Sequence, residues 1–251
     1  MEFPFPKIEK ITVYPRTFLK DVCVSFCFRP VLSYDDAIRN FIDFRQEYFR
    51  ISSNEWAELK PREEGVATII SSSDSQIIFS FYLDVISLKV KIPTYKQFGN
   101  LMAFLPVMVA FLETQGIDTL EDIRITKFNE THYGFQSDSS SVETAMKGIF
   151  SPEMMDWDGF RNPDFSDVAR WERRIDFSDD SDNAKAMVMY GFIKDDIDRK
   201  KGSLTLKTSV VKSGSIDRDC LVDELEQCNV SIDSAFHWAA SDDILKEMQK
   251  K

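Results

Sequence analysis

The order of predicted secondary-structure elements limits the fold of this chain more than any other feature, because each half carries the same order. Apolar residues with a period of two predict strands, and those with a helical period predict helices. Each half reads as a strand, a helix, a three-stranded meander and a long apolar helix. In the first half the predicted elements are Val22 to Phe28, Tyr34 to Phe49, Gly65 to Ile70, Ile77 to Tyr82, Val85 to Ile92 and Thr94 to Thr114. In the second half they are Ile123 to Phe128, Val142 to Phe150, Val168 to Phe177, Ala186 to Ile193, Leu204 to Val211 and a helix that begins near Asp217.

This repeated order predicts an α+β fold of two pseudo-duplicated repeats, residues 1–118 and 119–251, fused in one compact unit. The long apolar helices must be covered on more than one side, so we expect a curved antiparallel sheet with helices on one face. Three helix ends also carry recognisable signals. Ser33 with Asp36 resembles a capping box, Gly116 is the expected stop of the central helix, and Ser241 is the expected cap of a final short helix.

Composition indicates a folded globular protein that does not bind nucleic acid by default. The 251 residues are 43% hydrophobic, which is enough for a proper core. Forty-two acidic and 31 basic side chains give a formal net charge of -11, which repels phosphate backbones unless basic residues gather on one face. The 21 phenylalanines are interpreted mainly as core residues, with a stacking surface as the alternative.

The chain opens without the pattern of a signal peptide, since Met1 to Lys10 mixes two prolines with charges. The longest apolar run, Leu101 to Leu112, contains Pro106 and falls short of the roughly 20 residues that cross a bilayer. We therefore expect a kinked buried helix, no membrane association and a cytoplasmic location.

The four cysteines are expected to stay unpaired. Cys23 and Cys27 lie on one predicted strand, roughly 13 Å apart at about 3.3 Å per residue, beyond the about 7 Å limit for disulfide-bonded Cα atoms. Cys220 and Cys228 lie eight residues apart on a predicted helix and fail the same test. We interpret all four as small core residues in a reducing compartment.

The least regular stretch, Ser151 to Asp167, is the candidate partner-binding site. Apolar and aromatic side chains alternate there with aspartates, and long irregular loops often carry function. The candidate partner-binding residues are Met154, Met155, Trp157, Phe160 and Phe165. The alternative is that these side chains plug a sheet edge. The matching connector of the first half, Arg50 to Glu64, contains Trp56, which favours that alternative slightly.

The sequence offers little recognisable catalytic chemistry, and we predict no enzyme, no cofactor and no metal. The two histidines, His132 and His237, are interpreted as structural. No nucleophile elbow, Walker-type loop or dinucleotide-binding fingerprint is present. Two acidic clusters are predicted to be solvated turns at opposite ends of one strand, roughly 30 Å apart, too far for one metal site. They comprise Asp179, Asp180 and Asp182, and Asp195, Asp196 and Asp198.

Three passages carry a resemblance to a known group of proteins. The first passage is Gln76 to Phe98, in which Asp84, Tyr95 and Phe98 are the matching positions. The second is Ile123 to Glu130, in which the matching positions are Arg124, Lys127, Phe128 and Asn129. The third is Ala235 to Met248. With them the chain resembles a sporadically distributed family of bacterial conserved hypothetical proteins of similar length. Lys127 and Phe128 stand where that family usually has an arginine-tyrosine pair, so a role that depends on the tyrosine hydroxyl is not carried over. The resemblance supports the fold and supplies no catalytic residue. The doubled order is also similar to the saddle of TATA-binding proteins, at the level of fold only.

Three functions remain as hypotheses at this point. The first is a non-enzymatic protein-interaction module, an accessory or immunity-type component of a bacterial defence or toxin system, which binds a partner through its sheet face or through Ser151 to Asp167. The second is a small-molecule or nucleotide sensor with an apolar pocket around Phe98, Leu105 and Phe236. The third is a cryptic hydrolase or nuclease. Nucleic-acid binding would regain support if Arg170, Arg173, Arg174 and Lys185 gathered on one open face.

Overall fold

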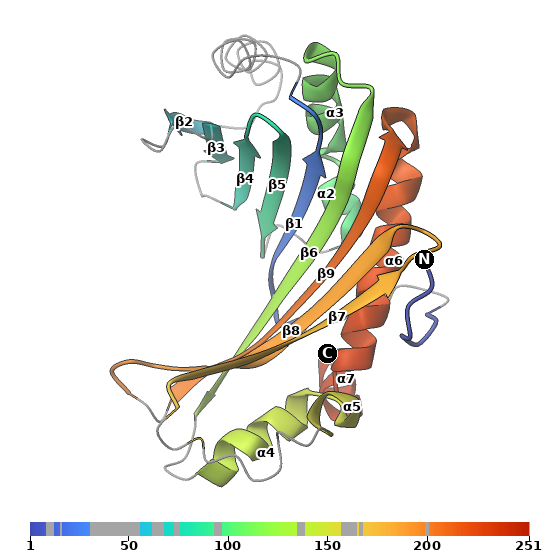
Figure 1. The fold of residues 1–251 in the computed structure, drawn as a ribbon. Coiled ribbons are helices and arrows are strands. Elements are labelled where there is room, and N and C mark those ends of the chain that lie inside the picture. The colour runs from blue at the N-terminus through green and yellow to red at the C-terminus, as the bar shows by residue number, and fades with distance from the viewer. Residues whose placement is uncertain are drawn as a thin grey trace. The chain divides into compact units, whose positions relative to one another are not determined.

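A computed structural model shows a mixed α+β protein with an antiparallel sheet (Figure 1), which confirms the predicted fold class. The structure describes residues 1–8, 13–15, 17–30, 56–61, 68–72, 76–92, 97–134, 139–156, 165, 168–198 and 201–250. The predicted helix at Tyr34 to Phe49, with its Ser33 cap, lies outside these described residues.

The described strands are β1 Leu19–Cys27, β2 Trp56–Pro61, β3 Thr68–Ser72, β4 Ile77–Phe81, β5 Val85–Lys91, β6 Thr119–Gly134, β7 Arg170–Asp179, β8 Ala184–Lys194 and β9 Lys201–Asp217. The described helices are α2 Phe98–Met102, α3 Leu105–Thr114, α4 Ser139–Ile149, α5 Pro152–Met155, the short 3₁₀ helix η2 Arg218–Cys220, α6 Leu221–Ala239 and α7 Asp242–Gln249. The hydrogen-bonded strand order is β2-β3-β4-β5-β1-β6-β9-β8-β7. None of the helices in these ranges has both the length and the apolar character needed to cross a bilayer.

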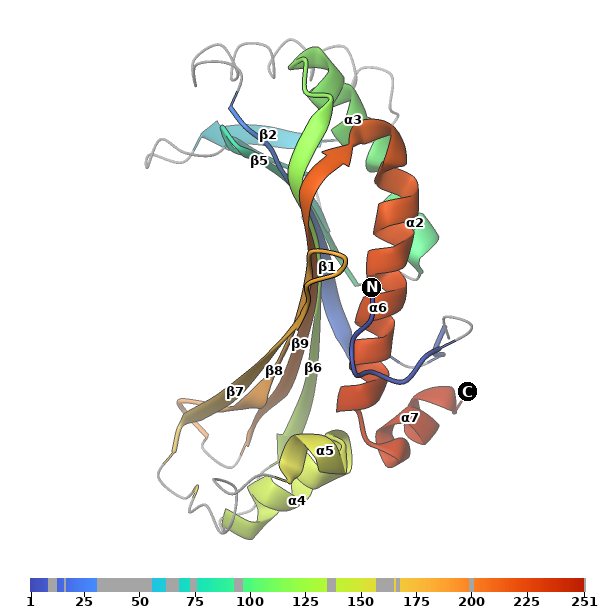
Figure 2. The same ribbon diagram turned by 45° about the vertical axis from the view of Figure 1, so that its right-hand side comes forward.

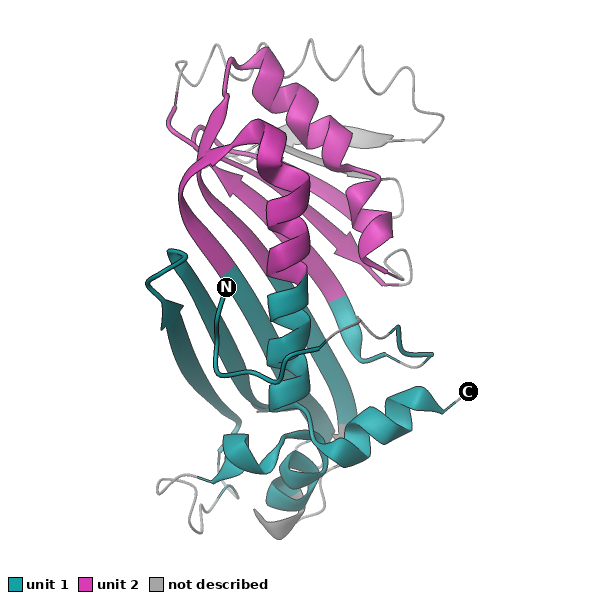
Figure 3. Ribbon diagram, turned by 90° about the vertical axis from the view of Figure 1, so that its right-hand side faces the viewer, with its two compact units in different colours: residues 1–20, 126–210, 230–251 teal, residues 21–125, 211–229 magenta. Residues whose placement is uncertain are grey.

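The chain divides into two compact units, each built from separate segments (Figure 3). Unit 1 consists of residues 1–20, 126–210 and 230–251, and unit 2 consists of residues 21–125 and 211–229. Each unit therefore draws on both predicted repeats. The predicted boundary between residues 118 and 119 concerns an internal duplication, and it stays a prediction.

Unit 2 contains the meander predicted for the first half. β1 pairs with β5 and β5 pairs with β4, so that Leu88 stands between Val24 and Phe79. These three side chains are fully buried, while their strand neighbours alternate toward solvent. The rings of Phe81 and Phe111 lie 4.9 Å apart, which packs α3 against β4.

Unit 1 is built on the β7–β8 hairpin, the neighbouring parts of β6 and β9, and the helices α4, α5, α7 and the end of α6 (Figure 2). The hairpin pairs Trp171 with Phe192, Arg173 with Tyr190 and Phe177 with Ala186. Because side chains alternate along a strand, these residues share one face. That face packs on α6, since the rings of Phe177 and Trp238 lie 5.3 Å apart.

Two helix termini form as predicted. Gly116 adopts a φ of 69° after α3, and the amide of Ile117 bonds the carbonyl of Leu112, a left-handed helix ending that favours glycine. The Ser241 hydroxyl accepts from the amide of Ile244 at 3.2 Å and so caps α7.

Several predicted features are wrong in detail. The predicted continuous helix from Thr94 to Thr114 is two helices, because Pro106 is tolerated in the first turn of α3 but not inside a longer helix. The connector around Trp56 contains the short strand β2, which was not predicted from the sequence. Cys220 is exposed in η2 rather than in the core.

We predict that Gly191→Ala destabilises unit 1. A Cβ at this position would lie 2.0 Å from the carbonyl oxygen of Trp171 and 2.8 Å from the Cα of Glu172, so the β7–β8 pair would have to separate. The expected loss in the free energy of unfolding is about 2 kcal/mol, measured by urea denaturation. The matched control is Gly148→Ala in α4, where a Cβ meets nothing within 4 Å and helix propensity favours alanine. A Gly191→Ala variant as stable as the parent would contradict the close approach of β7 and β8.

Candidate functional site

The predicted partner-binding residues that the structure describes lie in the core of unit 1. Met154 is fully buried, and Met155 and Phe165 are buried as well. Phe165 packs edge-on against Phe192 of β8 with ring centroids 5.0 Å apart, and the Tyr190 hydroxyl donates to the carbonyl of Met154. These contacts favour the alternative interpretation, in which the segment covers the sheet. The other two candidates, Trp157 and Phe160, lie outside the described residues.

The two acidic clusters occupy turns at opposite ends of β8, as the sequence predicts. Asp179 accepts hydrogen bonds from the Ser181 hydroxyl at 2.6 Å and from the Glu2 amide at 2.6 Å. Asp195 accepts from the amides of Ile197 and Asp198 at 2.8 and 2.9 Å. In the described part of the chain, no three His, Cys, Asp or Glu side chains are grouped so that they could hold a metal ion.

A polar network joins the N-terminal segment, β6 and α6 inside unit 1. Lys127 and Asp233 form an ion pair at 2.5 Å, with both side chains largely buried. His237 bonds the Tyr14 hydroxyl through Nε2 at 2.7 Å and the Asp233 carbonyl through Nδ1 at 2.8 Å. Burial, with a smaller contribution from the Asp233 charge, raises the pKa of Tyr14 above its ordinary value. Both ring nitrogens of His237 are engaged within the protein, which is the arrangement of a structural histidine.

The other ionisable groups singled out in the sequence are also engaged. His132 Nδ1 lies 3.0 Å from the hydroxyl of Ser203, and burial is the main cause that raises the pKa of the Cys27 thiol. Arg173 lies on the face toward α6 beside Tyr190, whereas Arg170 and Arg174 alternate with it. Three of the four basic residues that would have revived nucleic-acid binding, Arg170, Arg174 and Lys185, therefore share one face, and Arg173 lies on the other.

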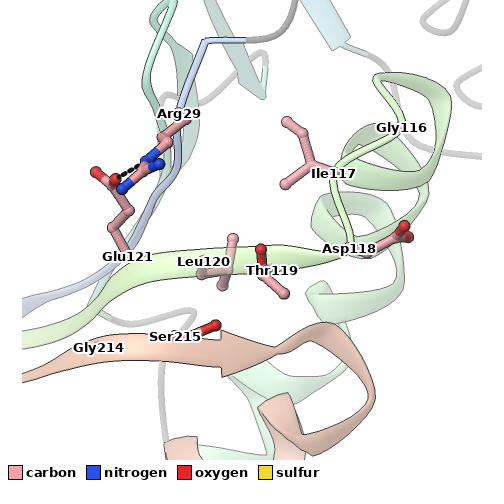
Figure 4. Close-up of a pocket in the computed structure, with 9 residues that line it drawn as sticks. All are labelled: Arg29, Gly116, Ile117, Asp118, Thr119, Leu120, Glu121, Gly214 and Ser215. Carbon is pink, nitrogen blue, oxygen red and sulfur yellow. Dashed lines mark hydrogen bonds and ion pairs between the residues drawn. The ribbon is translucent and has the colours of Figure 1, made fainter.

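A pocket of about 580 Å³ with both polar and apolar lining residues opens in unit 2 (Figure 4). Its lining consists of Arg29, Gly116, Ile117, Asp118, Thr119, Leu120, Glu121, Gly214 and Ser215. Arg29 Nε lies 2.6 Å from Glu121 Oε1 on one side of the pocket. On the other side Arg218 fixes the loop before β6, through a bond to the Ile117 carbonyl at 3.2 Å and an ion pair with Asp118 at 3.1 Å.

The apolar space beside Phe236 is much smaller. It lies in unit 1 between Leu204, Leu206 and Phe236, and measures about 20 Å³. A volume of this size accommodates about one water molecule. The pocket in unit 2 is the larger one, and charged and hydroxyl side chains contribute to its lining.

The four strands of unit 1 present a second surface, made of the side chains that alternate with those facing α6. We call it the far face, and its members are Thr126, Phe128, Glu130, His132, Arg170, Glu172, Arg174, Asp176, Ser178, Lys185, Met187, Met189, Gly191, Ile193, Ser203, Thr205, Lys207 and Ser209. The hydroxyls of Thr126 and Ser209 lie 3.0 Å apart on it, which joins β6 to β9. Phe128, Met187 and Met189 are only half-buried, and Ile193 is 36% exposed. Gly191, Ser203, Thr205 and Ser209 are buried, so the accessible part of the far face has partly exposed apolar side chains among charges of both signs.

No protein-family model matches the chain, and the search of curated proteins finds no match. Function must therefore be inferred from geometry.

We predict that Ser181→Ala raises the pKa of Asp179. The Ser181 hydroxyl is the largest cause that holds this pKa below the ordinary 3.8, followed by the amide of Glu2. A carboxyl with a lowered folded pKa contributes stability above the unfolded pKa, and this stability is lost as pH falls through the folded pKa. Titration of the carboxyl carbon by NMR measures the change. Asp195, whose pKa is lowered mainly by the amides of Asp198 and Ile197, serves as the internal control. An unchanged Asp179 pKa would contradict the hydrogen bond.

Proposed function

We propose that this protein is a non-enzymatic interaction module that binds a protein partner through the far face of unit 1. The observation that carries the proposal is the placement of Phe128, Met187 and Met189 on that face, half-buried in the free chain. Their strand neighbours Lys127 and Val188 are buried on the side of α6, so the apolar residues of the far face are not needed for that core. Methionine side chains adapt to a partner's shape, which suits them to a contact surface.

The partner expected from this surface is a protein with exposed apolar side chains flanked by charges of both signs. Lys185, Lys207 and Arg174 on the far face are balanced by Glu130, Glu172 and Asp176. Protein interfaces commonly have an apolar centre and a polar rim of this kind. Ile197 lies in the turn between β8 and β9 and is 98% exposed, so it offers a further apolar side chain to a partner.

Nucleic acid is a poorer match for the same surface. Arg170 pairs with Glu172 at 2.6 Å, and Arg174 pairs with Asp176 at 2.8 Å. Both guanidinium groups are thus neutralised within β7, and the chain has a net charge of -11. We place the protein in the cytoplasm, where reducing conditions keep an exposed cysteine such as Cys220 as a thiol.

The accessory or immunity-type role in a bacterial defence or toxin system is the biological setting that we propose for this module. The internal duplication belongs to the same proposal, together with a curved sheet covered by helices on one face. Both halves contain a strand, β1 or β6, then a three-stranded run, β3 to β5 or β7 to β9, then a helix, α3 or α6, and this shared series supports two related repeats although β2, α2, α4, α5, η2 and α7 interrupt or follow it. An effector gene next to this one would identify the partner.

We predict that the double substitution Met187→Asp and Met189→Asp abolishes partner capture while the fold is retained. Desolvating two carboxylates at an apolar contact is costly, whereas both positions keep access to water in the free protein. Affinity capture from a lysate of the source cells, followed by quantitative mass spectrometry, measures the loss. The control is Val222→Asp on α6, an apolar side chain of unit 2 that is 46% exposed and is not a member of the far face. Equal capture by both variants, or no stoichiometric partner for the parent, would overturn the proposal.

A small-molecule sensor is the second candidate, because the pocket of about 580 Å³ in unit 2 lies within the size range of ligand sites. This pocket lies beside Arg29, whereas the sequence predicted an apolar pocket around Phe98, Leu105 and Phe236. A ligand that binds only the folded state raises the melting temperature. We predict that a metabolite that raises the melting temperature of the parent protein no longer raises that of Arg29→Ala but still raises that of Arg170→Ala. A screen without such a metabolite would remove this candidate.

A further inference from the structure

β7 ends the strand order and leaves one of its edges without a paired strand among the described residues. In an antiparallel ladder, successive residues point their backbone groups to opposite sides of the strand. The amide of Lys194 bonds the carbonyl of Ala169, which places the odd-numbered residues of β7 in the ladder with β8. The amides and carbonyls of residues 170, 172, 174, 176 and 178 therefore point away from β8. An unpaired row of this kind is a template for another strand.

The side chains along this edge alternate in charge with a period of two. Arg170, Glu172, Arg174 and Asp176 follow one another on the far face, as positive, negative, positive and negative. Within the strand Arg170 reaches Glu172 at 2.6 Å and Arg174 reaches Asp176 at 2.8 Å. All four groups lie at the border of the sheet, where a second strand would meet them.

We propose that β7 pairs antiparallel with β7 of a second copy of this chain, with the two-fold axis at Arg173. This register sets Arg170 opposite the second copy's Asp176 and Glu172 opposite the second copy's Arg174, and symmetry doubles both pairs. Opposite charges directly across a strand pair are stabilising. The self-complementary pattern is what identifies a second copy as the occupant, since the same patch serves both sides of a two-fold interface.

Neighbouring registers are less favourable. An axis at Glu172 sets Arg170 against Arg174, and an axis at Arg174 sets Glu172 against Asp176. An axis at Ile175 keeps the contact between Arg174 and Asp176 but leaves Glu172 opposite Ser178. Like charges directly across a strand pair are destabilising. Only the axis at Arg173 sets each of the four charged side chains of β7 opposite a side chain of opposite charge in the second copy.

The face toward α6 is compatible with the same register and also limits its strength. Trp171 stands opposite the second copy's Ile175, and both side chains are half-buried, so an apolar contact forms on each side of the axis. At the axis itself Arg173 meets its own copy. Its NH1 lies 3.5 Å from the Tyr190 hydroxyl, and the like-charge contact opposes tight association. The dimer is therefore expected to depend on protein concentration.

Sedimentation equilibrium on the full chain tests the pairing, because a dimer has twice the 29.0 kDa of one chain. We predict that Arg174→Glu raises the dimer dissociation constant about tenfold or more, since two attractive contacts become repulsive. Adding Glu172→Arg to the same chain restores association, because these two positions face each other across the axis. The control is Lys185→Glu, which reverses an exposed charge on β8 away from the edge. Circular dichroism of every variant checks that the fold persists.

A cross-linking experiment fixes the register independently. In a Cys220→Ser background, which removes the exposed thiol, Arg173→Cys places two thiols directly opposite each other at the axis. Residues opposite at a non-hydrogen-bonded position have Cα atoms about 4.5 Å apart, within the range for a disulfide. We expect a covalent dimer from Arg173→Cys and none from Arg174→Cys. A parent that stays monomeric at every concentration overturns the proposal. The proposal is also overturned if Asp176→Arg, and not Glu172→Arg, restores the association of the Arg174→Glu chain. Pairing of β7 with a strand of another protein, and not with its own copy, would overturn it as well.

Discussion

The ion pair between Lys127 and Asp233 is the interaction on which the arrangement of unit 1 depends. It lies largely buried, with 2.5 Å between Lys127 Nζ and Asp233 Oδ1, and it ties β6 to α6. Loss of one partner from such a pair costs about 3–5 kcal/mol, because the other charge is left buried. A slip of β6 by one residue would turn Lys127 away from α6 and bring Phe128 inside. The pair therefore determines which side chains of β6 face the helix and which form the far face.

The same alternation separates the side chains that pack on α6 from those of the far face. On β8 the residues Ala186, Val188 and Tyr190 are buried toward α6, and Met187 and Met189 stay half-buried on the other side. Gly191 sits among the latter, where the carbonyl of Trp171 leaves no room for a side chain. At this point β7 lies close to β8. The backbone groups on the outer edge of β7 still point away from β8.

The sequence predicted the elements well where periodicity was strong. β4 and β5 formed within one residue of their predicted ends because apolar residues recur there at every second position, at Ile77, Phe79 and Phe81 and at Ile86, Leu88 and Val90. β6 and β9 are longer than predicted, since polar residues such as Thr119 and Lys201 extend a strand as easily as apolar ones once neighbours pair with it. β2 was missed because Glu58, Lys60 and Pro61 are unfavourable in strands, although a proline is tolerated at the end of an edge strand.

The candidate site was harder to predict than the fold. Met154 and Phe165 carried the apolar signal in an irregular segment, yet the structure uses them to cover β8. The signal for the far face was the run from Ala184 to Lys194, which has apolar residues at both alternate sets of positions. Sequence alone cannot say which set faces a helix, because that depends on contacts distant in the chain, such as Lys127 with Asp233.

Methionine oxidation by hydrogen peroxide, read by mass spectrometry on the intact protein, tests the separation of the two faces most directly. We expect Met187 and Met189 to oxidise readily in the free protein and to become protected when a partner is bound. Met146 and Met154, both fully buried, should resist oxidation in both states. Equal reactivity of all four methionines in the free protein, or unchanged reactivity of Met187 and Met189 in a complex, would contradict the assignment of the far face as the binding surface.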